Sequence, residues 1–303
     1  MIEFNSATKV YRSLVGRSVT AVDDFSLRVA EGEVLGIAGP NGAGKSTLIN
    51  LVLGYIRPTK GSVTIQDNSP RKYVEQNGIG YLSELMTIPA SWTTESALQR
   101  FAVLADVPAA EVKKRVDAVI DQLGIGEHRS KKIKALSKGN LQRLGLAQSL
   151  LRDENLMILD EPTHGLDPVW TQRFRDIVEG LRRPGRTVLI ASHNLDELQR
   201  LADRVAIIDR GKLQRLVQTG YDQSAETAGT YRIAVAEGSE RMTEILPNAK
   251  NAGGGEFEVP VKSVAELNEM LSRLISAHIL VASVVPARSV LEQQFREAVG
   301  ETK

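Results

Sequence analysis

One short segment constrains the fold of this chain more than any other part of it. Residues 39–46 read Gly-Pro-Asn-Gly-Ala-Gly-Lys-Ser and complete the pattern G-x-x-x-x-G-K-S, between an apolar run at 34–38 and a helix-period segment at 47–53. Glycines let the backbone wrap closely around a phosphate, the helix start directs N–H groups at the anion, and Lys45 adds a positive charge. The context favours a phosphate-binding loop over a glycine-rich turn with a surface lysine, and its expected members are Gly39, Pro40, Asn41, Gly42, Ala43, Gly44, Lys45, Ser46 and Thr47.

A second apolar run, 156–159, ends in two acidic residues, Asp160 and Glu161. A buried parallel strand can carry an acid rigidly to a phosphate at its carboxyl end. We therefore expect Asp160 and the Ser46 hydroxyl to bind Mg²⁺, and Glu161 to act as the base for an attacking water. An acidic strand end that caps the following helix is the alternative for this pair in isolation, and the phosphate-binding loop makes it the weaker one.

The spacing of the apolar runs predicts an α/β fold in the first part of the chain. From residue 1 to about 217, short β-branched runs alternate with longer helix-period segments, which is typical of a mainly parallel sheet. Four runs are apolar without alternation and should be central strands covered on both faces: 34–38, 156–159, 187–190 and 205–208. The 303 residues correspond to two domains at about 150 residues each.

The sequence changes character after this region. Residues 218–229 are polar and lack periodicity, which predicts a linker. Residues 230–303 are predicted to form a small α+β accessory domain, in which we find no catalytic constellation. Its expected strands are 231–236, 257–261 and 279–285, and Pro260 favours an edge position for the second of them.

Two capping boxes predict the helices of this accessory domain. In each, a serine is followed three residues later by a glutamate, first at Ser263 with Glu266 and then at Ser289 with Glu292. The helix that begins after Ser263 should bury one apolar face, made by Val264, Leu267, Leu271, Leu274 and Ile275.

Charge and composition exclude several classes of binding partner and of chemical site. Lys and Arg number 38 against 37 Asp and Glu, so the formal charge of +1 gives no general attraction to nucleic acid or anionic lipid. Without cysteine there is no disulfide, thiolate metal site or cysteine nucleophile. The first residues lack a secretory signal pattern, and the apolar stretches fall short of the ~20 residues that cross a bilayer. We expect a cytoplasmic protein that reaches a membrane only through a partner.

Further motifs, in a fixed order along residues 1–217, resemble the nucleotide-binding subunit of an ATP-binding cassette (ABC) transporter. Residues 136–140, Leu-Ser-Lys-Gly-Asn, are similar to the signature of that family, Leu-Ser-Gly-Gly-Gln, and are expected to open a helix. Ser137 and Gly139, which carry the phosphate contact in the family, are retained, whereas Lys138 and Asn140 depart from its pattern. The resemblance implies a P-loop NTPase cassette with a helical subdomain at about 85–150, which binds ATP and Mg²⁺.

In the family, the signature contacts the nucleotide of the other subunit, which implies a head-to-tail dimer with an identical or a related ATP-binding subunit. Residues 164–168, His-Gly-Leu-Asp-Pro, resemble the loop that couples the two sites, so the resemblance assigns Asp167 to nucleotide contact. His164 is unusual at its position and is either a polar loop residue or a participant in the chemistry.

Three other residues take expected roles from the same resemblance. Tyr11 is similar to the aromatic residue that stacks on adenine, and His193 to the switch histidine that contacts the γ-phosphate. Glu84 stands where most members have glutamine at the end of the strand 79–84. It either keeps the metal-sensing role through its carboxylate or is a solvated loop acid.

The resemblance also implies the partner. The segment between Glu84 and Lys134 faces the membrane subunit in the family, and Trp92, Phe101 and Leu104 either supply that contact or belong to the segment's own core. Residues 289–297 resemble the closing helix of the ABC-2 exporter branch.

The expected function is ATP hydrolysis in a dimer that powers a separate integral membrane permease, with export as the direction and a place on the inner face of the cell membrane. No nucleic-acid partner is expected. The alternative is a soluble ABC ATPase that remodels a macromolecular complex. A module that senses ATP without hydrolysing it is disfavoured by Asp160, Glu161 and His193.

Overall fold

The computed structural model describes residues 1–12, 18–219, 229–287 and 290–300. The chain separates into two compact units, with residues 1–219 in the first and residues 229–297 in the second. Residues 220–228, which make up most of the predicted linker, lie outside the described ranges.

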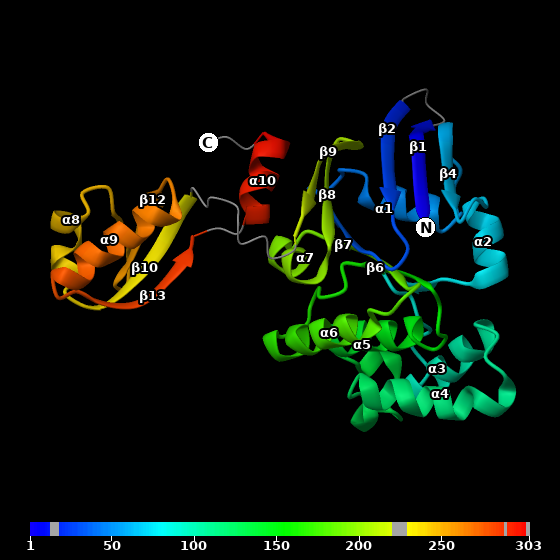
Figure 1. Ribbon diagram of the computed structural model, residues 1–303. Coiled ribbons are helices and arrows are strands. Elements are labelled where there is room, and N and C mark those ends of the chain that lie inside the picture. The colour runs from blue at the N-terminus through cyan, green and yellow to red at the C-terminus, as the bar shows by residue number, and fades with distance from the viewer. Residues whose placement is uncertain (13–17, 220–228, 288–289, 301–303) are drawn as a thin grey trace. The chain divides into compact units, whose positions relative to one another are not determined.

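The first unit is built on a six-stranded sheet of order β5-β6-β7-β3-β8-β9 (Figure 1). Its neighbouring strands from β5 to β8 are parallel, and β9 is antiparallel to β8. The four runs predicted as central strands occupy the four interior positions, as predicted. The strands are β3 (Val34–Ala38), β5 (Gly80–Leu82), β6 (Leu156–Asp160), β7 (Thr187–Ser192), β8 (Arg204–Asp209) and β9 (Lys212–Gln218).

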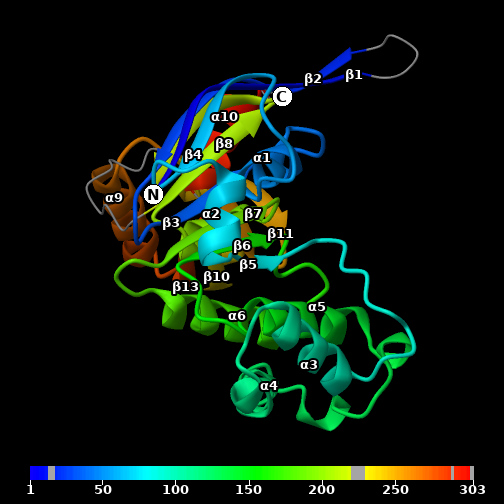
Figure 2. The ribbon, with the colours of Figure 1, turned by 90° about the vertical axis from the view of Figure 1, so that its right-hand side faces the viewer.

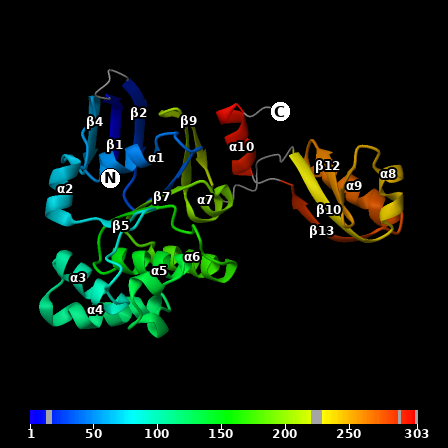
Figure 3. The same cartoon turned by 180° about the vertical axis from the view of Figure 1, so that it is seen from behind.

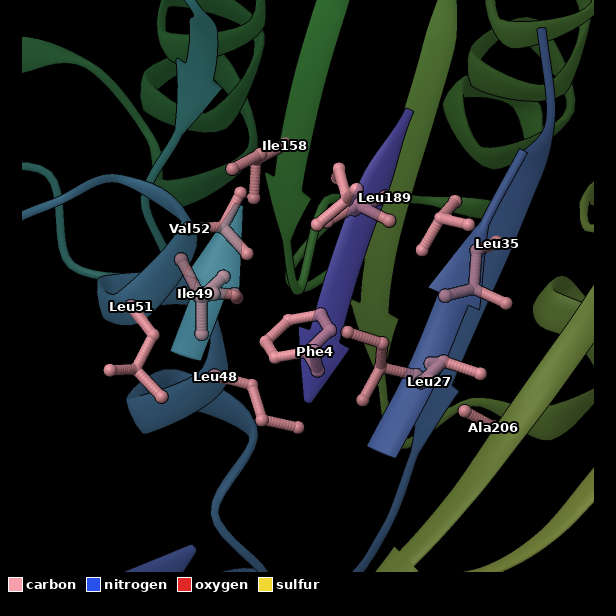
Figure 4. Close-up of a cluster of buried hydrophobic side chains, with 14 of the residues drawn as sticks. Phe4, Leu27, Leu35, Leu48, Ile49, Leu51, Val52, Ile158, Leu189 and Ala206 are labelled. Carbon is pink, nitrogen blue, oxygen red and sulfur yellow. The ribbon is translucent and has the colours of Figure 1, made fainter. Parts of the chain in front are cut away.

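A three-stranded antiparallel sheet of order β2-β1-β4 completes the β structure of this unit (Figure 2). It consists of β1 (Ile2–Arg12), β2 (Ser18–Val29) and β4 (Lys60–Ile65) and is accompanied by α1 (Lys45–Val52) and α2 (Pro70–Asn77). Figure 4 shows side chains from both sheets and from α1 in one apolar cluster. Phe4 of β1 meets Phe25 of β2 edge to face, and α1 contributes Leu48, Ile49, Leu51 and Val52. This packing fixes the start of α1, and therefore the loop before it.

Four helices of the first unit gather at the end away from β1, β2 and β4 (Figures 1 and 3). They are α3 (Thr94–Leu104), α4 (Ala109–Gln122), α5 (Lys138–Ser149) and α6 (Pro168–Leu181). Two single-turn helices, η1 (Gly126–His128) and η2 (Ile133–Ala135), lie between α4 and α5 in the chain. The short helix α7 (Leu195–Leu201) follows β7. Within the described ranges, none of the helices is both long and apolar enough to span a bilayer.

The three apolar residues singled out in the helical segment differ in burial. Trp92 and Phe101 are half-buried, and the Trp92 ring lies under the Arg100 guanidinium at 4.6 Å. Leu104 is 77% exposed at the end of α3, so it does not belong to the core of the segment.

The second unit is an antiparallel sheet of order β11-β12-β10-β13 with helices packed on it. The strands are β10 (Gly229–Glu237), β11 (Lys250–Gly253), β12 (Glu256–Val261) and β13 (Leu280–Pro286). The helices of this sheet are η3 (Ser239–Arg241), α8 (Met242–Ile245) and α9 (Val264–Ser276). The last described helix is α10 (Val290–Val299), whose residues up to Glu297 are grouped with this unit. The core of the second unit contains Ile233, Met242, Phe257, Val259 and Leu274.

Pro260 does not make β12 an edge strand, contrary to the prediction. β12 lies between β11 and β10, and its proline pairs with Thr230 of β10. The pairing of β11 with β12 reaches only as far as Glu258, opposite Lys250 at the start of β11, so Pro260 has no partner on β11. A missing N–H is tolerated there because no ladder bond to β11 is required at that position.

The predicted start of α9 is correct, but its apolar face is narrower than predicted. The Ser263 hydroxyl accepts a hydrogen bond from the Glu266 N–H, while the Glu266 carboxylate accepts from the Lys262 N–H. Leu267 and Leu274 are buried, whereas Val264 and Ile275 are largely exposed. Both side chains lie at one margin of the helical stripe, away from the side on which Leu267 and Leu274 pack into the core. The second predicted capping box involves Ser289, which lies outside the described residues.

Adjacent residues of α9 give a test of this packing. Leu274 is 0% and Ile275 is 65% exposed. We expect Leu274→Ala to lower the unfolding free energy of the second unit by about 2–5 kcal/mol, because it leaves a cavity. Ile275→Ala should change it by less than about 0.5 kcal/mol. Urea unfolding followed by circular dichroism measures both, and equal effects of the two substitutions would contradict the assigned helix face.

Candidate active site

The register of the parallel strands brings four chain segments to one end of the sheet. Leu82 pairs with Leu159, Asp160 with Ala191, and Ala38 with Ser192, so β5, β6, β7 and β3 end at the same level. The segments that follow these strands surround a pocket of about 850 Å³. Its lining is Ala21, Pro40, Asn41, Gly42, Ala43, Gly44, Lys45, Ser46, Thr47, Glu84, Asp160, Glu161, His164 and His193. The predicted loop, acids and switch histidine therefore meet in one place.

The phosphate-binding loop has the backbone that its glycines predict. Gly44 is the N-cap of α1 with φ of 109°, a left-handed conformation that favours glycine, and no side chain caps this helix. A Cβ on Gly44 would lie 2.5 Å from the Ala21 carbonyl oxygen, so a side chain is excluded by space as well. The N–H groups at the start of α1 consequently face the pocket without a competing side chain, which suits an anion.

Lys45 is held inside the loop rather than extended into solvent. It is buried, and its ammonium donates hydrogen bonds to the carbonyl oxygens of Gly39 at 2.6 Å and Pro40 at 3.3 Å. The positive charge is thus fixed beside the N–H groups of α1, where a bound phosphate would meet both.

Glu161 is fixed more firmly than any other acid of the pocket. Its φ of 48° places a non-glycine residue in the left-handed region, which costs roughly 1–2 kcal/mol. The carboxylate accepts hydrogen bonds from the His193 N–H at 3.0 Å and from the Ser192 hydroxyl at 3.3 Å. The His193 ring adds a contact between Nδ1 and Oε2 at 2.7 Å. Because a carboxylate only accepts, Nδ1 carries the proton, and Nε2 is the ring nitrogen left for a ligand.

Asp160 concentrates negative charge in the pocket. It is 6% exposed at the end of β6. Burial raises the pKa of Asp160 to about 6, and the charges of Glu84 and Glu161 act in the same direction while Lys45 opposes them. Ionised Asp160 is therefore costly in the protein alone, and a divalent cation would relieve that cost.

The residues present fit a Mg²⁺ ion that is shared with phosphate. Within the described ranges, no group of three His, Asp or Glu side chains could hold a metal by itself. Mg²⁺ usually keeps several waters and binds one or two protein oxygens together with substrate phosphates. Ser46 and Asp160 offer two such oxygens on the pocket wall, and Glu84 lines the same pocket.

The signature residues lie apart from the pocket of their own chain. Ser137 caps α5 and accepts from the Asn140 N–H at 3.2 Å, but neither Ser137 nor Gly139 lines the pocket. Asp167 caps α6 through the Trp170 N–H at 2.9 Å and also does not line it. Tyr11 is partly exposed on β1, opposite Val19 of β2, and is not a lining residue either.

Three residues that support the site were not expected from the sequence. Ala21 of β2 lines the pocket, and its carbonyl oxygen leaves no space for a side chain at Gly44, as described above. Ser192 donates to Glu161, and the Gln142 amide donates to the carbonyl oxygens of Glu161 at 3.1 Å and Pro162 at 3.0 Å. A hydroxyl next to His193 was a visible signal for Ser192, whereas the other two contacts depend on tertiary packing.

The raised pKa of Asp160 predicts a pH-dependent stability in the absence of Mg²⁺. The folded chain holds this proton up to pH about 6 and the unfolded chain only to about 4, so the unfolding free energy falls as pH rises through that window. At pH 8, the unfolding free energy of Asp160→Asn should therefore exceed that of the parent chain by about 1–3 kcal/mol. This difference should become smaller towards pH 5.

The measurement is urea unfolding in EDTA at both pH values. Asp167→Asn is the matched control, because Asp167 is exposed and asparagine caps a helix equally well. If Asp160→Asn raised the unfolding free energy by the same amount at pH 5 and pH 8, this would contradict the inference that the ionised Asp160 carboxylate destabilises the folded chain.

Comparison with known proteins agrees with this geometry. A sequence profile described as ABC transporter matches residues 22–164. An uncharacterised ABC transporter ATP-binding protein, YhcH of Bacillus subtilis, is 33% identical over 100% of this chain and 97% of its own. The bacitracin transport ATP-binding protein BcrA of Bacillus licheniformis is 33% identical over 70% of this chain and 68% of its own. The methionine import ATP-binding protein MetN of Geobacillus kaustophilus is 34% identical over 70% and 64%.

A solved structure shares the fold of the first unit. It is the ATP-binding cassette MJ0796, a dimer in a post-hydrolysis state with ADP and Pi, with a TM-score of 0.67 and 22% identity over 72% of this chain and 99% of that one. The pocket, its loop and its acids, together with the relative that spans the whole chain, lead to one conclusion: the chain belongs to the ABC transporter family and is an ATP-binding subunit with ATPase activity.

Proposed function

We propose that this subunit uses ATP and Mg²⁺, in a dimer with a second copy or a related ATP-binding subunit, to drive export through a separate integral membrane permease. The observation that carries the proposal is the convergence of Lys45, Asp160, Glu161 and His193 on one pocket at the ends of neighbouring parallel strands. In such a pocket, hydrolysis depends on positioning and on electrostatic stabilisation rather than on covalent chemistry.

Glu161 is proposed as the general base. Its carboxylate takes a proton from water while the water oxygen attacks the γ-phosphorus and the bond to the bridging oxygen of ADP breaks. The three hydrogen bonds from Ser192 and His193 support this role because they hold the carboxylate in one orientation. His193 would contact the γ-phosphate through Nε2, and Lys45 would offset charge on the phosphates.

Mg²⁺ would be held by Ser46 and Asp160 and would supply neutralisation of phosphate charge. Glu84 is proposed to keep the metal-sensing position that glutamine occupies in most relatives of this kind. Its place in the pocket lining and its effect on Asp160 support that role over a solvated loop acid. Its negative charge would make nucleotide binding more dependent on the metal.

The dimer is proposed from the place of the signature. Ser137 and Gly139 open α5 outside the pocket of their own chain, so their N–H groups suit a phosphate held by a second chain. Asp167 and Tyr11 are proposed to contact nucleotide from the neighbouring loop and from β1. Two ATP molecules between two chains would favour the closed dimer, and hydrolysis would release it, since nucleotide would bind the closed state more tightly.

The permease is proposed to contact the helical segment at about 85–150. Val103 and Leu104 are large apolar side chains exposed on α3, which supports a protein contact at this surface. Export is supported by the resemblance of the closing segment, 289–297, to exporter subunits. One of the relatives is an import protein by its description, so the direction depends on that resemblance. We propose a place on the inner face of the membrane and no nucleic-acid partner.

Replacement of the proposed base tests the chemistry. Glu161→Gln should leave ATP binding intact and lower turnover by at least ~100-fold, the scale of a lost general base. Single-turnover hydrolysis and nucleotide binding measure the two effects separately. Glu75→Gln, on the exposed surface of α2, is the control and should not change either quantity. Near-normal turnover of Glu161→Gln would remove this residue from the role.

Identification of the partner tests transport against the soluble alternative. The chain would be purified from the membranes of its own host in mild detergent and its companions identified by mass spectrometry. A stoichiometric polytopic membrane protein is the expected result. Recovery of the chain only from the soluble fraction, with ribosomes or nucleic acid, would contradict the permease and favour a remodelling ATPase.

A further inference from the structure

His164 lies where three parts of the first unit meet. It belongs to the segment between β6 and α6, and it lines the same pocket as Glu161 and His193. Its Nε2 lies 2.8 Å from the ammonium of Lys138, the first residue of α5. Lys138 and His164 are two of the positions at which this sequence departs from the pattern of its family. The fold brings these two departures into contact across 26 positions of the chain.

The chemistry of the two groups fixes the proton on His164. A lysine ammonium only donates, so Nε2 of His164 accepts and the ring proton is on Nδ1. The ring of His164 meets the ring of His193 edge to face, with centroids 6.3 Å apart and an angle of 89° between the planes. His193 in turn donates from Nδ1 to Glu161. A continuous series of contacts therefore leads from the start of α5 to the proposed general base.

The backbone around this series is closely packed. A Cβ on Gly139 would lie 3.0 Å from the Gly165 carbonyl oxygen, and a Cβ on Gly165 would lie 3.0 Å from Cδ of Lys138. The amide of Gln142 adds the hydrogen bonds to Glu161 and Pro162 described above. The start of α5 therefore lies against the backbone of this loop at Gly139, and the Lys138 side chain lies along Gly165.

We propose that His164 is a positioning residue: held by Lys138, it sets the orientation of the His193 ring against Glu161 and so links the signature helix to the hydrolysis site of the same chain. This inference depends on the roles proposed for Glu161 and His193. Lys138 and His164 are both exposed, and such a pair contributes little to stability, so its effect should appear in turnover.

A mutant cycle on ATP hydrolysis tests the link. His164→Ala should lower kcat by ~10-fold and change KM by less, since a small misplacement of a reacting group is costly mainly in the reaction step. Lys138→Ala should lower kcat by less, because it removes the tether and leaves the ring. The double variant should match His164→Ala alone, since the two residues act through one series of contacts.

Two substitutions separate the halves of the link. His164→Phe keeps a ring against His193 and loses the acceptor for Lys138, so it should retain most of kcat and become insensitive to Lys138→Ala. His164→Gln keeps an acceptor and loses the ring, so its kcat should be as low as that of His164→Ala. His278→Asn, an exposed histidine of the second unit with φ of 59°, is the histidine control and should behave as the parent chain.

Thermal unfolding and ATP binding establish that each variant is folded before its rate is compared. Parent-like kcat for His164→Ala, or effects of the two alanine substitutions that multiply, would overturn the inference. Glu161→Gln separates this failure from that of the proposed function. If it abolishes turnover while the His164 variants do not change it, only the link is wrong; if it also leaves turnover intact, the proposed chemistry is wrong.

Discussion

The parallel pairing of β7 with β3 and with β6 places every part of the candidate site. Parallel strands of matched register end at one edge of a sheet, so everything that follows them in sequence is brought together there. The loop 39–44, the acids after β6 and the histidine after β7 are far apart in the chain and adjacent in space for this single reason. The apolar cluster between the two sheets and α1 holds the pairing in place.

The pocket at that edge is electrostatically unbalanced in the protein alone. Asp160 is buried close to Glu84 and Glu161, and the ammonium of Lys45 only partly offsets these charges. Such an arrangement costs stability unless a cation and phosphate complete it. The left-handed backbone at Glu161 is a second local cost. Strain and unpaired charge of this kind are commonly concentrated where a protein does chemistry.

The contacts of His164 with Lys138 and with His193 connect the pocket to the start of α5. In the proposed dimer, α5 serves the nucleotide of the partner, while His193 and Glu161 serve that of their own chain. A contact between α5 and His164 would let each chain adjust its own chemistry to the state of the nucleotide across the interface. Gly139 lies close to the Gly165 carbonyl oxygen, so a movement of α5 towards this loop would meet its backbone.

The features that depend on neighbouring residues could be predicted from the amino-acid sequence. The phosphate-binding loop, the strands with uninterrupted apolar runs, the acids at the end of β6 and the cap of α9 follow from local spacing and local hydrogen bonding, which do not need the rest of the fold. The features that depend on distant partners could not be predicted in this way. β12 is interior although it contains Pro260, because its pairing with β11 does not reach that residue. Ile275 is exposed although it continues the apolar pattern of α9, because the core of the second unit includes Leu274 and not its neighbour. The burial of Asp160 among other charges and the meeting of Lys138 with His164 arise only when separate strands and helices pack, since no local pattern encodes a contact between residues that the chain itself keeps apart.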